Sequence, residues 1–258
     1  MVNFLSFSFE TNASLYSPAT RRRWSPAGAT WYGAANGAGS DGGACGYGNA
    51  VGSRKHPFSS SIAAGSPSVF KAGKGCGACY QVRCTRDHAC SKKPVTVVIT
   101  DECPRGPCLV ESVHFDLNGT AIGAMALPRR ADRLRGVGVL PIQYTRVPCK
   151  FPHKTIAFHV ACQASNRNYF GSSSSRPDGE GSLSNVELGE SRSVNKATWR
   201  PMIQSWGALW KLDSGPKLRA PFSIRLTSQH SKKKVVAKNV VPARWRPGAT
   251  YRSLVNFH

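Results

Sequence analysis

The fold is decided by the stretch TDECPRGPCLVESVHFD, residues 100–116, which also carries the first candidate site. An apolar, β-branched run over residues 95–100 predicts a strand that leads into it. The strand ends in Asp101, the chain turns through proline and glycine between two cysteines, and a second acid, Asp116, follows close to His114. Carboxylates at the ends of rigid elements have a fixed direction and stay accessible, as binding or catalytic acids require. The stretch predicts a polar site, although Asp101 alone could cap a turn and His114 alone could be a core residue.

The bulk composition limits the class of protein. With 258 residues and 40% hydrophobic content, the chain is long enough for one large domain or two ordinary ones. Its formal charge of +22 would suit a nucleic-acid partner, but it is spread as +2, +8 and +12 over residues 1–27, 28–152 and 153–258. No recognisable nucleic-acid module or zinc-finger spacing accompanies this charge. We therefore expect no nucleic acid as partner, and an acidic matrix such as a polysaccharide instead.

Nine cysteines lie between residues 45 and 162. Cys76 and Cys79 have the spacing of a metal or redox pair, but neither a second suitable pair nor a βαβ setting is evident. We therefore expect a disulfide framework with no metal and no cofactor. Such a framework implies secretion, although the apolar start at residues 1–9 has no basic flank. No stretch approaches the roughly 20 apolar residues of a membrane span.

Cysteine content and the pattern of hydrophobic residues divide the chain into three parts. We expect a leader or disordered linker at residues 1–27, a cysteine-rich domain at 28–152 and a cysteine-poor domain at 153–258. The first domain should contain strands at 73–84, 95–100 and 137–147, the last as one or two strands, and one short helix at 118–127. The second should contain strands at 156–160, 183–188, 206–212, 222–227 and 235–241, with a low-complexity loop at 171–176. Several short strands without a helical period predict a β-sandwich.

Seven short motifs follow one another along the chain. They are TWYG at 30–33, DGGACG at 41–46, GCGACY at 75–80, TD at 100–101, HFD at 114–116, GAMA at 123–126 and SWGALW at 205–210. In this order and spacing they resemble the plant expansin family, specifically the β-expansins, which include the grass group-1 pollen allergens. The resemblance covers residues 28–258. It implies an all-β, two-domain fold, with a six-stranded double-psi β-barrel, similar to family 45 endoglucanases, followed by an immunoglobulin-like β-sandwich that binds cellulose.

The resemblance also implies a function. Members of this family loosen plant cell walls by disrupting noncovalent contacts between cellulose microfibrils and matrix glycans, so the chain is expected not to be an enzyme. The implied partners are cellulose, xylan, mixed-linkage glucan and acidic polysaccharide, bound in the cell wall by a secreted monomer. Two alternatives stay open: a weak endoglucanase of family 45 type, and a basic polysaccharide-binding protein without loosening activity.

Candidate site residues are carried over from the family's motifs. The polar groove of the first domain is expected to contain Thr30, Tyr32, Asp41, Asp101, His114 and Asp116. Asp116 matches the acid of the related endoglucanases, which are inverting enzymes and need a second carboxylate about 6.5 to 9.5 Å away as base. Expansins lack that base, and the resemblance does not give Asp101 this role.

An aromatic platform for glucan chains is implied at Trp31, with Tyr32 beside it, and at Tyr169 and Trp206 in the second domain. Aromatic rings offer large, stiff area to the apolar face of a sugar ring. In a strand, however, packing inside a sandwich is the ordinary role of a tryptophan. We expect such a core or rim position for the three other tryptophans of the second domain, Trp199, Trp210 and Trp245.

The resemblance implies the disulfides Cys45–Cys76, Cys79–Cys149 and Cys84–Cys90. We add Cys103–Cys108, because these two cysteines lie five residues apart across a proline and glycine turn, and this leaves Cys162 unpaired. Asn118 begins a glycosylation sequon, Asn-Gly-Thr. Residues 170–181 depart from the family pattern of an apolar strand, so we expect an open sandwich edge there.

Overall fold

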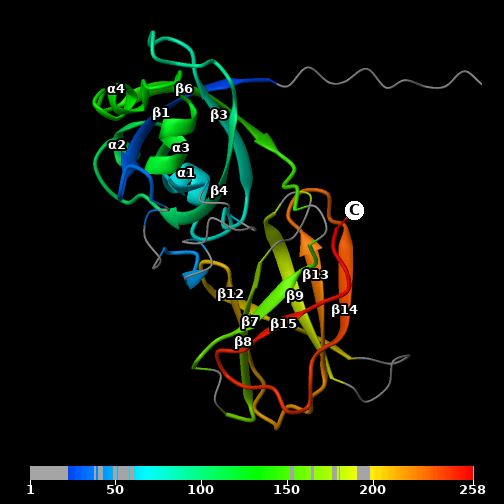
Figure 1. Ribbon diagram of the computed structural model, residues 1–258. Coiled ribbons are helices and arrows are strands. Elements are labelled where there is room, and N and C mark those ends of the chain that lie inside the picture. The colour runs from blue at the N-terminus through cyan, green and yellow to red at the C-terminus, as the bar shows by residue number, and fades with distance from the viewer. Residues whose placement is uncertain are drawn as a thin grey trace, which may run out of the picture.

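The computed structural model describes residues 23–37, 39, 43–48, 51, 58, 61–151, 154–163, 166–175, 179, 181–190 and 198–257. These residues form two lobes, a barrel with four short helices and a two-layer sandwich (Figure 1). The expected boundary at residues 152 and 153 lies outside the described residues.

Six strands close the barrel in the order β1-β5-β2-β4-β3-β6. Their bounds are β1 Ser25–Tyr32, β2 Ile62–Gly65, β3 Cys79–Cys84, β4 Val95–Glu102, β5 His114–Asn118 and β6 Leu140–Val147. The helices are α1 Pro67–Phe70, α2 Pro107–Val110, α3 Gly119–Ala124 and α4 Ala131–Arg135. This closed barrel confirms the fold expected for the first domain. One detail of the expectation is wrong, since residues 25–27 belong to β1 rather than to a linker.

The core of the barrel contains every second side chain along its strands. Phe115 of β5 meets Tyr80 and Tyr144, in each case with ring centroids 5.3 Å apart. Successive side chains of a strand point to opposite faces. Because Phe115 points into the core, its neighbours His114 and Asp116 point the other way. Polar side chains are thereby collected on the outer side of β5.

Four disulfides pin the barrel and its loops. They are Cys45–Cys76, Cys79–Cys149, Cys84–Cys90 and Cys103–Cys108, which are the four expected pairs. Cys162 is a free, exposed cysteine. The bridges close segments of 31, 70, 6 and 5 residues, so the second constrains the unfolded chain most.

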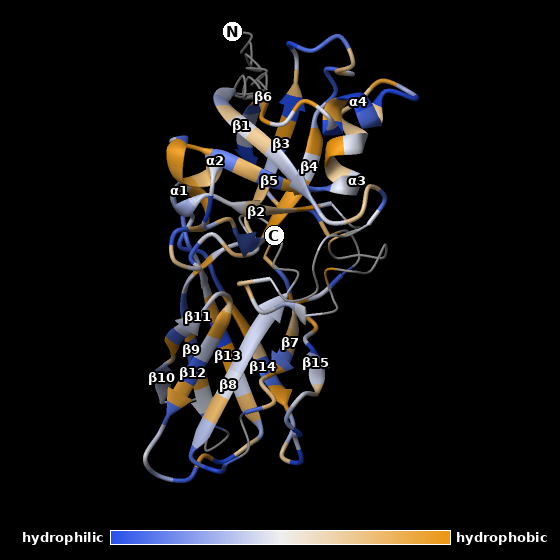
Figure 2. Ribbon diagram, turned by 90° about the vertical axis from the view of Figure 1, so that its left-hand side faces the viewer, coloured by the Kyte–Doolittle hydropathy of each residue, from blue (hydrophilic) through white to orange (hydrophobic). Residues whose placement is uncertain are grey.

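The second domain stacks two antiparallel sheets. One has the order β10-β9-β13-β14 and the other β11-β12-β8-β7-β15. The bounds are β7 Ala157–Val160, β8 Tyr169–Ser175, β9 Leu183–Glu190, β10 Trp199–Pro201, β11 Ile203–Trp206, β12 Leu209–Asp213, β13 Phe222–Ser228, β14 Lys234–Val241 and β15 Thr250–Arg252. Hydrophobic residues follow the strands of both lobes (Figure 2). Phe170 packs between Phe222 and Trp245, with ring centroids at 5.2 and 5.6 Å, so the inward faces of both sheets form one core.

Two expectations for the second domain are wrong. The serine-rich residues 171–175 are not a loop, because β8 pairs with β12 on one side and β7 on the other. Ladder hydrogen bonds from both neighbours override the weak strand preference of glycine and serine, and no sheet edge opens here. Residues 206–212 are not one strand either, since the chain reverses at Gly207, where φ is +51°, and returns as β12.

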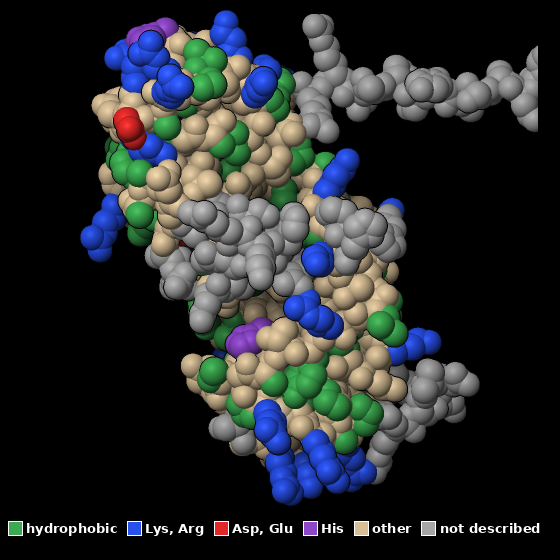
Figure 3. Space-filling view, in the orientation of Figure 1, with side chains coloured by type: hydrophobic (Ala, Val, Ile, Leu, Met, Phe, Trp, Pro, Cys, Tyr) green, Lys and Arg blue, Asp and Glu red, His purple; other side chains and the backbone are tan. Residues whose placement is uncertain are grey.

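The two domains touch through backbone as well as side chains. The N–H of Ala208 donates to the Cys45 carbonyl at 3.0 Å, and the N–H of Gly179 donates to the Cys149 carbonyl at 3.0 Å. The Arg146 guanidinium donates to Ser182 Oγ at 2.7 Å. Lys and Arg side chains are scattered over both domains, with groups at the two far ends (Figure 3). No helix in the described part of the chain is long and apolar enough to cross a membrane.

Candidate functional site

Strand register builds the floor of the site from four neighbouring strands. Thr30 of β1 is the register partner of Asp116 on β5, and Asp116 is in turn opposite Ala64 on β2. Ala64 is also the partner of Asp101 on β4. Thr30, Asp116, Ala64 and Asp101 therefore form a row across the outer side of the barrel. A small residue between the two acids leaves open space above the floor.

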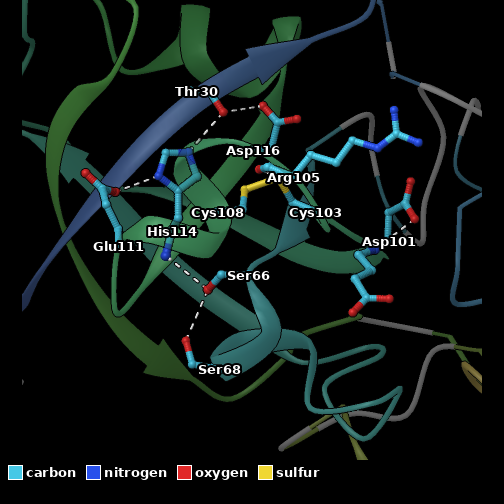
Figure 4. The surroundings of a disulfide bond; sticks show 11 residues. Thr30, Ser66, Ser68, Asp101, Cys103, Arg105, Cys108, Glu111, His114 and Asp116 are labelled. Carbon is cyan, nitrogen blue, oxygen red and sulfur yellow. Dashed lines mark hydrogen bonds and ion pairs between the residues drawn. A yellow bond between two sulfur atoms is a disulfide. The ribbon is translucent and has the colours of Figure 1, made fainter.

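That space is a groove of about 550 Å³. Thr30, Trp31 and Tyr32 line it on the side of β1, and Ala64 and the two acids lie in its floor. Residues 102–107 form the opposite wall, held by the disulfide between Cys103 and Cys108. Arg105 extends from this wall (Figure 4). The groove combines three carboxyl groups, those of Asp101, Glu102 and Asp116, with one guanidinium and two aromatic rings, which is a set of groups suited to sugar hydroxyls and ring faces.

Asp116 is partly buried and accepts a hydrogen bond of 2.6 Å from the Thr30 hydroxyl. Burial raises the pKa of Asp116 above its ordinary value, and the negative charge of Asp101 acts in the same direction. The Thr30 hydrogen bond and the charge of His114 oppose this rise without cancelling it. Asp116 therefore keeps its proton to a higher pH than a carboxyl in solvent does.

His114 lies beneath the groove rather than in it, with no exposed surface. Its Nε2 is 3.0 Å from Thr30 Oγ1 and its Nδ1 is 2.6 Å from Glu111 Oε2. Its backbone N–H donates to Ser66 Oγ at 3.1 Å (Figure 4). The expected histidine is thus a fully hydrogen-bonded interior residue, and it reaches the groove through Thr30.

Asp101 has a structural task as well as a place in the groove. Its Oδ1 accepts the backbone N–H of Ala44 at 2.6 Å and that of Glu102 at 2.8 Å. Asp101 thereby ties the glycine-rich segment to the end of β4, so the turn-capping role weighed for it is real. Burial raises the pKa of Tyr32 well above its usual range, helped by the charges of Asp101 and Asp116, and the phenol stays protonated.

The candidate aromatic residues occupy both domains. Trp31 is half-buried and donates from Nε1 to the Arg135 carbonyl at 3.0 Å, which fixes its ring beside the groove. Trp206 is 53% exposed and lies at the domain junction, close to the backbone of Gly46 in the barrel. Tyr169 is half-buried on β8.

Strand pairing puts Tyr169 and Trp206 on one face. Trp206 is opposite Leu209 and Tyr169 is opposite Asp213, and both partners are on the outward side of β12. The rows of Tyr169 and Trp206 are separated by four residues along β12, or roughly 13 Å. Trp210, by contrast, is 8% exposed and points into the core, and Trp199 and Trp245 pack at rim and core.

The remaining candidates from the sequence are the groove residue Asp41 and the glycosylation site Asn118. Asp41 lies outside the described residues. Asn118 is fully buried, with Oδ1 accepting the Ala121 N–H and Nδ2 donating to the Gly37 carbonyl, so the folded chain leaves no room for a glycan there. Within the described parts of the chain, no group of three or more His, Cys, Asp or Glu side chains could hold a metal ion.

Sequence reasoning missed the roles of Glu111 and Ala64. Glu111 stands three residues before the histidine of the HFD motif, and this spacing was the only available signal. Nothing in the sequence around Ala64 marks it as part of a groove floor, because only strand pairing brings it between the two acids.

Comparisons with known proteins agree with this two-domain fold. Residues 62–144 match the family described as lytic transglycolase, and residues 156–242 match the expansin C-terminal domain. Expansin-B11 of Oryza sativa subsp. japonica is 58% identical over 236 residues, which cover 91% of this chain and 78% of that protein. Putative expansin-B2 of Arabidopsis thaliana is 56% identical over 234 residues, covering 91% and 83%.

Solved structures resemble the chain over both domains. The apo expansin of Clavibacter michiganensis is 22% identical, with a TM-score of 0.65, and the match covers 92% of this chain and 98% of that one. A point mutant of the same bacterial expansin, solved in complex with cellohexaose, matches with a TM-score of 0.65 and 21% identity over the same shares of the two chains.

A six-stranded barrel carrying a polar groove, followed by a β-sandwich with the expansin C-terminal pattern, defines the expansin class of two-domain proteins. Within that class, the chain belongs to the plant β-expansin family. Membership supports loosening of the plant cell wall as its general activity.

Proposed function

We propose that this chain loosens walls without hydrolysis, by binding glucan along a surface that runs from the groove to the outer face of the sandwich. The observation that carries the proposal is the unequal state of Asp116 and Asp101, the two acids in the floor of the groove. Burial raises the pKa of Asp116, so this carboxyl can hold a proton for a sugar oxygen to a higher pH, whereas Asp101 Oδ1 is occupied by two backbone N–H groups. An inverting hydrolase needs its second carboxylate free to activate water.

Binding alone can separate polysaccharides. Trp31 lines the groove in the barrel, Trp206 lies at the domain junction, and Tyr169 extends the surface along the sandwich. A glucan chain that lies on these rings gives up contacts with its neighbours, so the binding free energy shifts a junction from closed to open. The bacterial expansin solved with cellohexaose supports a linear glucan as ligand. The charge of +22 supports additional attraction to acidic matrix glycans in the wall.

The direct test is extension of heat-inactivated grass cell walls under constant load, with reducing-end release from soluble glucan measured in parallel. We expect purified protein to cause creep at acidic pH without releasing sugar. In Asp116→Asn, creep at acidic pH should fall about tenfold, which corresponds to the loss of one or two hydrogen bonds. Its pH dependence should flatten, because the carboxamide does not titrate. In the wild type, creep should decline as the pH rises through the titration of Asp116.

Asp87→Asn is the matched control, because Asp87 also accepts a backbone N–H in the barrel but lies in the loop closed by Cys84–Cys90. Its creep should equal that of the wild type. Sugar release that depends on Asp116 would establish the endoglucanase alternative instead. Binding that disappears at moderate salt, without creep, would establish a basic polysaccharide-binding protein.

A second variant tests the aromatic surface. Trp206→Ala removes a ring that is 53% exposed, so it should weaken binding to insoluble cellulose about tenfold with little change in stability. The measurement is a depletion isotherm on cellulose. Leu254→Ala, which removes a 97% exposed apolar side chain from the same domain, should leave the isotherm unchanged. Equal isotherms for Trp206→Ala and the wild type would exclude Trp206 from the binding surface.

A further inference from the structure

Glu111, His114, Thr30 and Asp116 form one continuous chain of hydrogen bonds. Glu111 Oε2 is 2.6 Å from His114 Nδ1, His114 Nε2 is 3.0 Å from Thr30 Oγ1, and Thr30 Oγ1 is 2.6 Å from Asp116 Oδ1 (Figure 4). One end of the chain is Asp116 in the groove. The other end is Glu111, whose side chain is 35% exposed.

Each contact in this chain holds one proton, and the Thr30 hydroxyl has a single proton to give. When Thr30 donates to Asp116, His114 Nε2 must carry a proton and donate to Thr30. When Asp116 carries the proton, Thr30 turns and donates to His114 Nε2, and Nδ1–H donates to Glu111. The same acidic proton can therefore reside on Asp116, on the imidazole ring or on Glu111, and the total charge is equal in all three cases.

We propose that Glu111 is a positioning residue of the groove: its carboxylate stabilises the doubly protonated ring of His114 and, through the Thr30 hydroxyl, stabilises the ionised form of Asp116. Asp116 lies within roughly 6 Å of the ring, a distance at which an opposite charge strongly favours a carboxylate. The inference rests on the proposed function, because it concerns the acid to which wall loosening is assigned.

The other groups facing this chain are few. Asp116 also faces Asp101 and Tyr32, and Glu102 and Arg105 line the same groove from the opposite wall. His114 faces Ser66 through its backbone. Among the described residues that contact the ring, Glu111 alone is acidic, so it supplies the negative charge next to the buried imidazole.

Gly28 on β1 makes room for Glu111. It is the register partner of His114, and a Cβ atom at Gly28 would lie 1.8 Å from Glu111 Oε2. The three atoms nearest to that Cβ all belong to the Glu111 carboxylate, which can swing into solvent. Gly28→Ala should therefore push the carboxylate off the ring without disturbing the backbone. Gly28→Ala thus removes the carboxylate from the His114 ring by steric exclusion, whereas Glu111→Gln removes its charge.

The test is NMR titration of the intact protein, following the ring nitrogens of His114 and the carboxyl carbon of Asp116. In the wild type, both ring nitrogens should be protonated when Asp116 is ionised. In Glu111→Gln and in Gly28→Ala, the ring should lose one proton, and the pKa of Asp116 should rise by about one unit.

Asp101→Asn is the control of opposite sign, because the Asp101 charge raises the pKa of Asp116 and the carboxamide can still accept the two backbone N–H groups. It should lower the pKa of Asp116. If Glu111 acted on Asp116 only as a nearby negative charge, as Asp101 does, Glu111→Gln would also lower the pKa of Asp116. This result would overturn the proposal. An Asp116 titration unchanged in both Glu111→Gln and Gly28→Ala would also overturn it.

Wall creep separates this inference from the proposed function. If the Asp116 titration moves as expected, the pH profile of creep should move upward with it. A shifted titration with an unshifted creep profile would leave the Glu111 inference standing and would remove Asp116 from the loosening step.

Discussion

Replacement of Gly207 by alanine is expected to force the two domains apart. Gly207 has φ of +51° at the turn between β11 and β12, and a Cβ there would lie 2.2 Å from the Ala44 carbonyl oxygen and 2.7 Å from Cys45 Cα. These are backbone atoms of the barrel next to a disulfide, so they cannot rotate away. Backbone strain and overpacking together should cost about 2–5 kcal/mol at the junction.

The loss should appear as a larger radius of gyration in solution X-ray scattering and as reduced wall creep. The hydrogen bond from Ala208 to Cys45 would be lost, and Trp206 would leave the side of Gly46. Gly215→Ala is the matched control, because Gly215 has φ of +68° but nothing lies within 4 Å of its Cβ position. It carries the same type of strain without the collision. An unchanged radius of gyration in Gly207→Ala would show that the junction does not depend on this close approach.

Removal of the Cys79–Cys149 disulfide is expected to destabilise the barrel by about 4 kcal/mol. The bridge joins β3 to the end of the barrel across 70 residues, so it removes more freedom from the unfolded chain than the shorter bridges do. The change is the double substitution Cys79→Ala with Cys149→Ala, and the measurement is equilibrium unfolding in denaturant.

The comparison variant is Cys84→Ala with Cys90→Ala. All four cysteines are buried, so the packing lost in the two variants is similar, but this bridge spans only 6 residues. Its loss should cost about 2 kcal/mol. Equal destabilisation by the two pairs would argue against the loop-closure explanation and in favour of packing as the main contribution.

These two predictions concern the same functional requirement. The proposed surface has its acid and two rings, Trp31 and Tyr32, in the barrel, and its remaining rings in the sandwich. It is continuous only while Gly207 lets the β11–β12 turn sit against the barrel and while the disulfides hold the barrel in shape. A long polymer can bind to both domains at once only when the binding groups of the barrel and of the sandwich are held at fixed positions relative to each other.

The sequence by itself determined the class of fold and the side chains of the groove that carry its chemistry on β1, β4 and β5. β-Branched runs, alternation and cysteine spacing depend on neighbouring residues, so they were sufficient for the strand at Val95, the strand at Phe222 and the Cys103–Cys108 bridge. The ordered motifs led to the family and, through it, to Thr30, Tyr32, Asp101 and Asp116 as groove residues.

Only the tertiary structure decided how these residues work. Strand pairing made a strand of the serine-rich residues 171–175, separated Trp206 from Trp210 onto opposite faces, and placed Ala64 between two acids distant from it in sequence. It also joined Glu111 to Asp116 through His114 and Thr30, the last of which is 84 residues away from the histidine. Contacts of this kind depend on which strands become neighbours. That choice is made by burial of the whole core, and no local pattern in the chain records it.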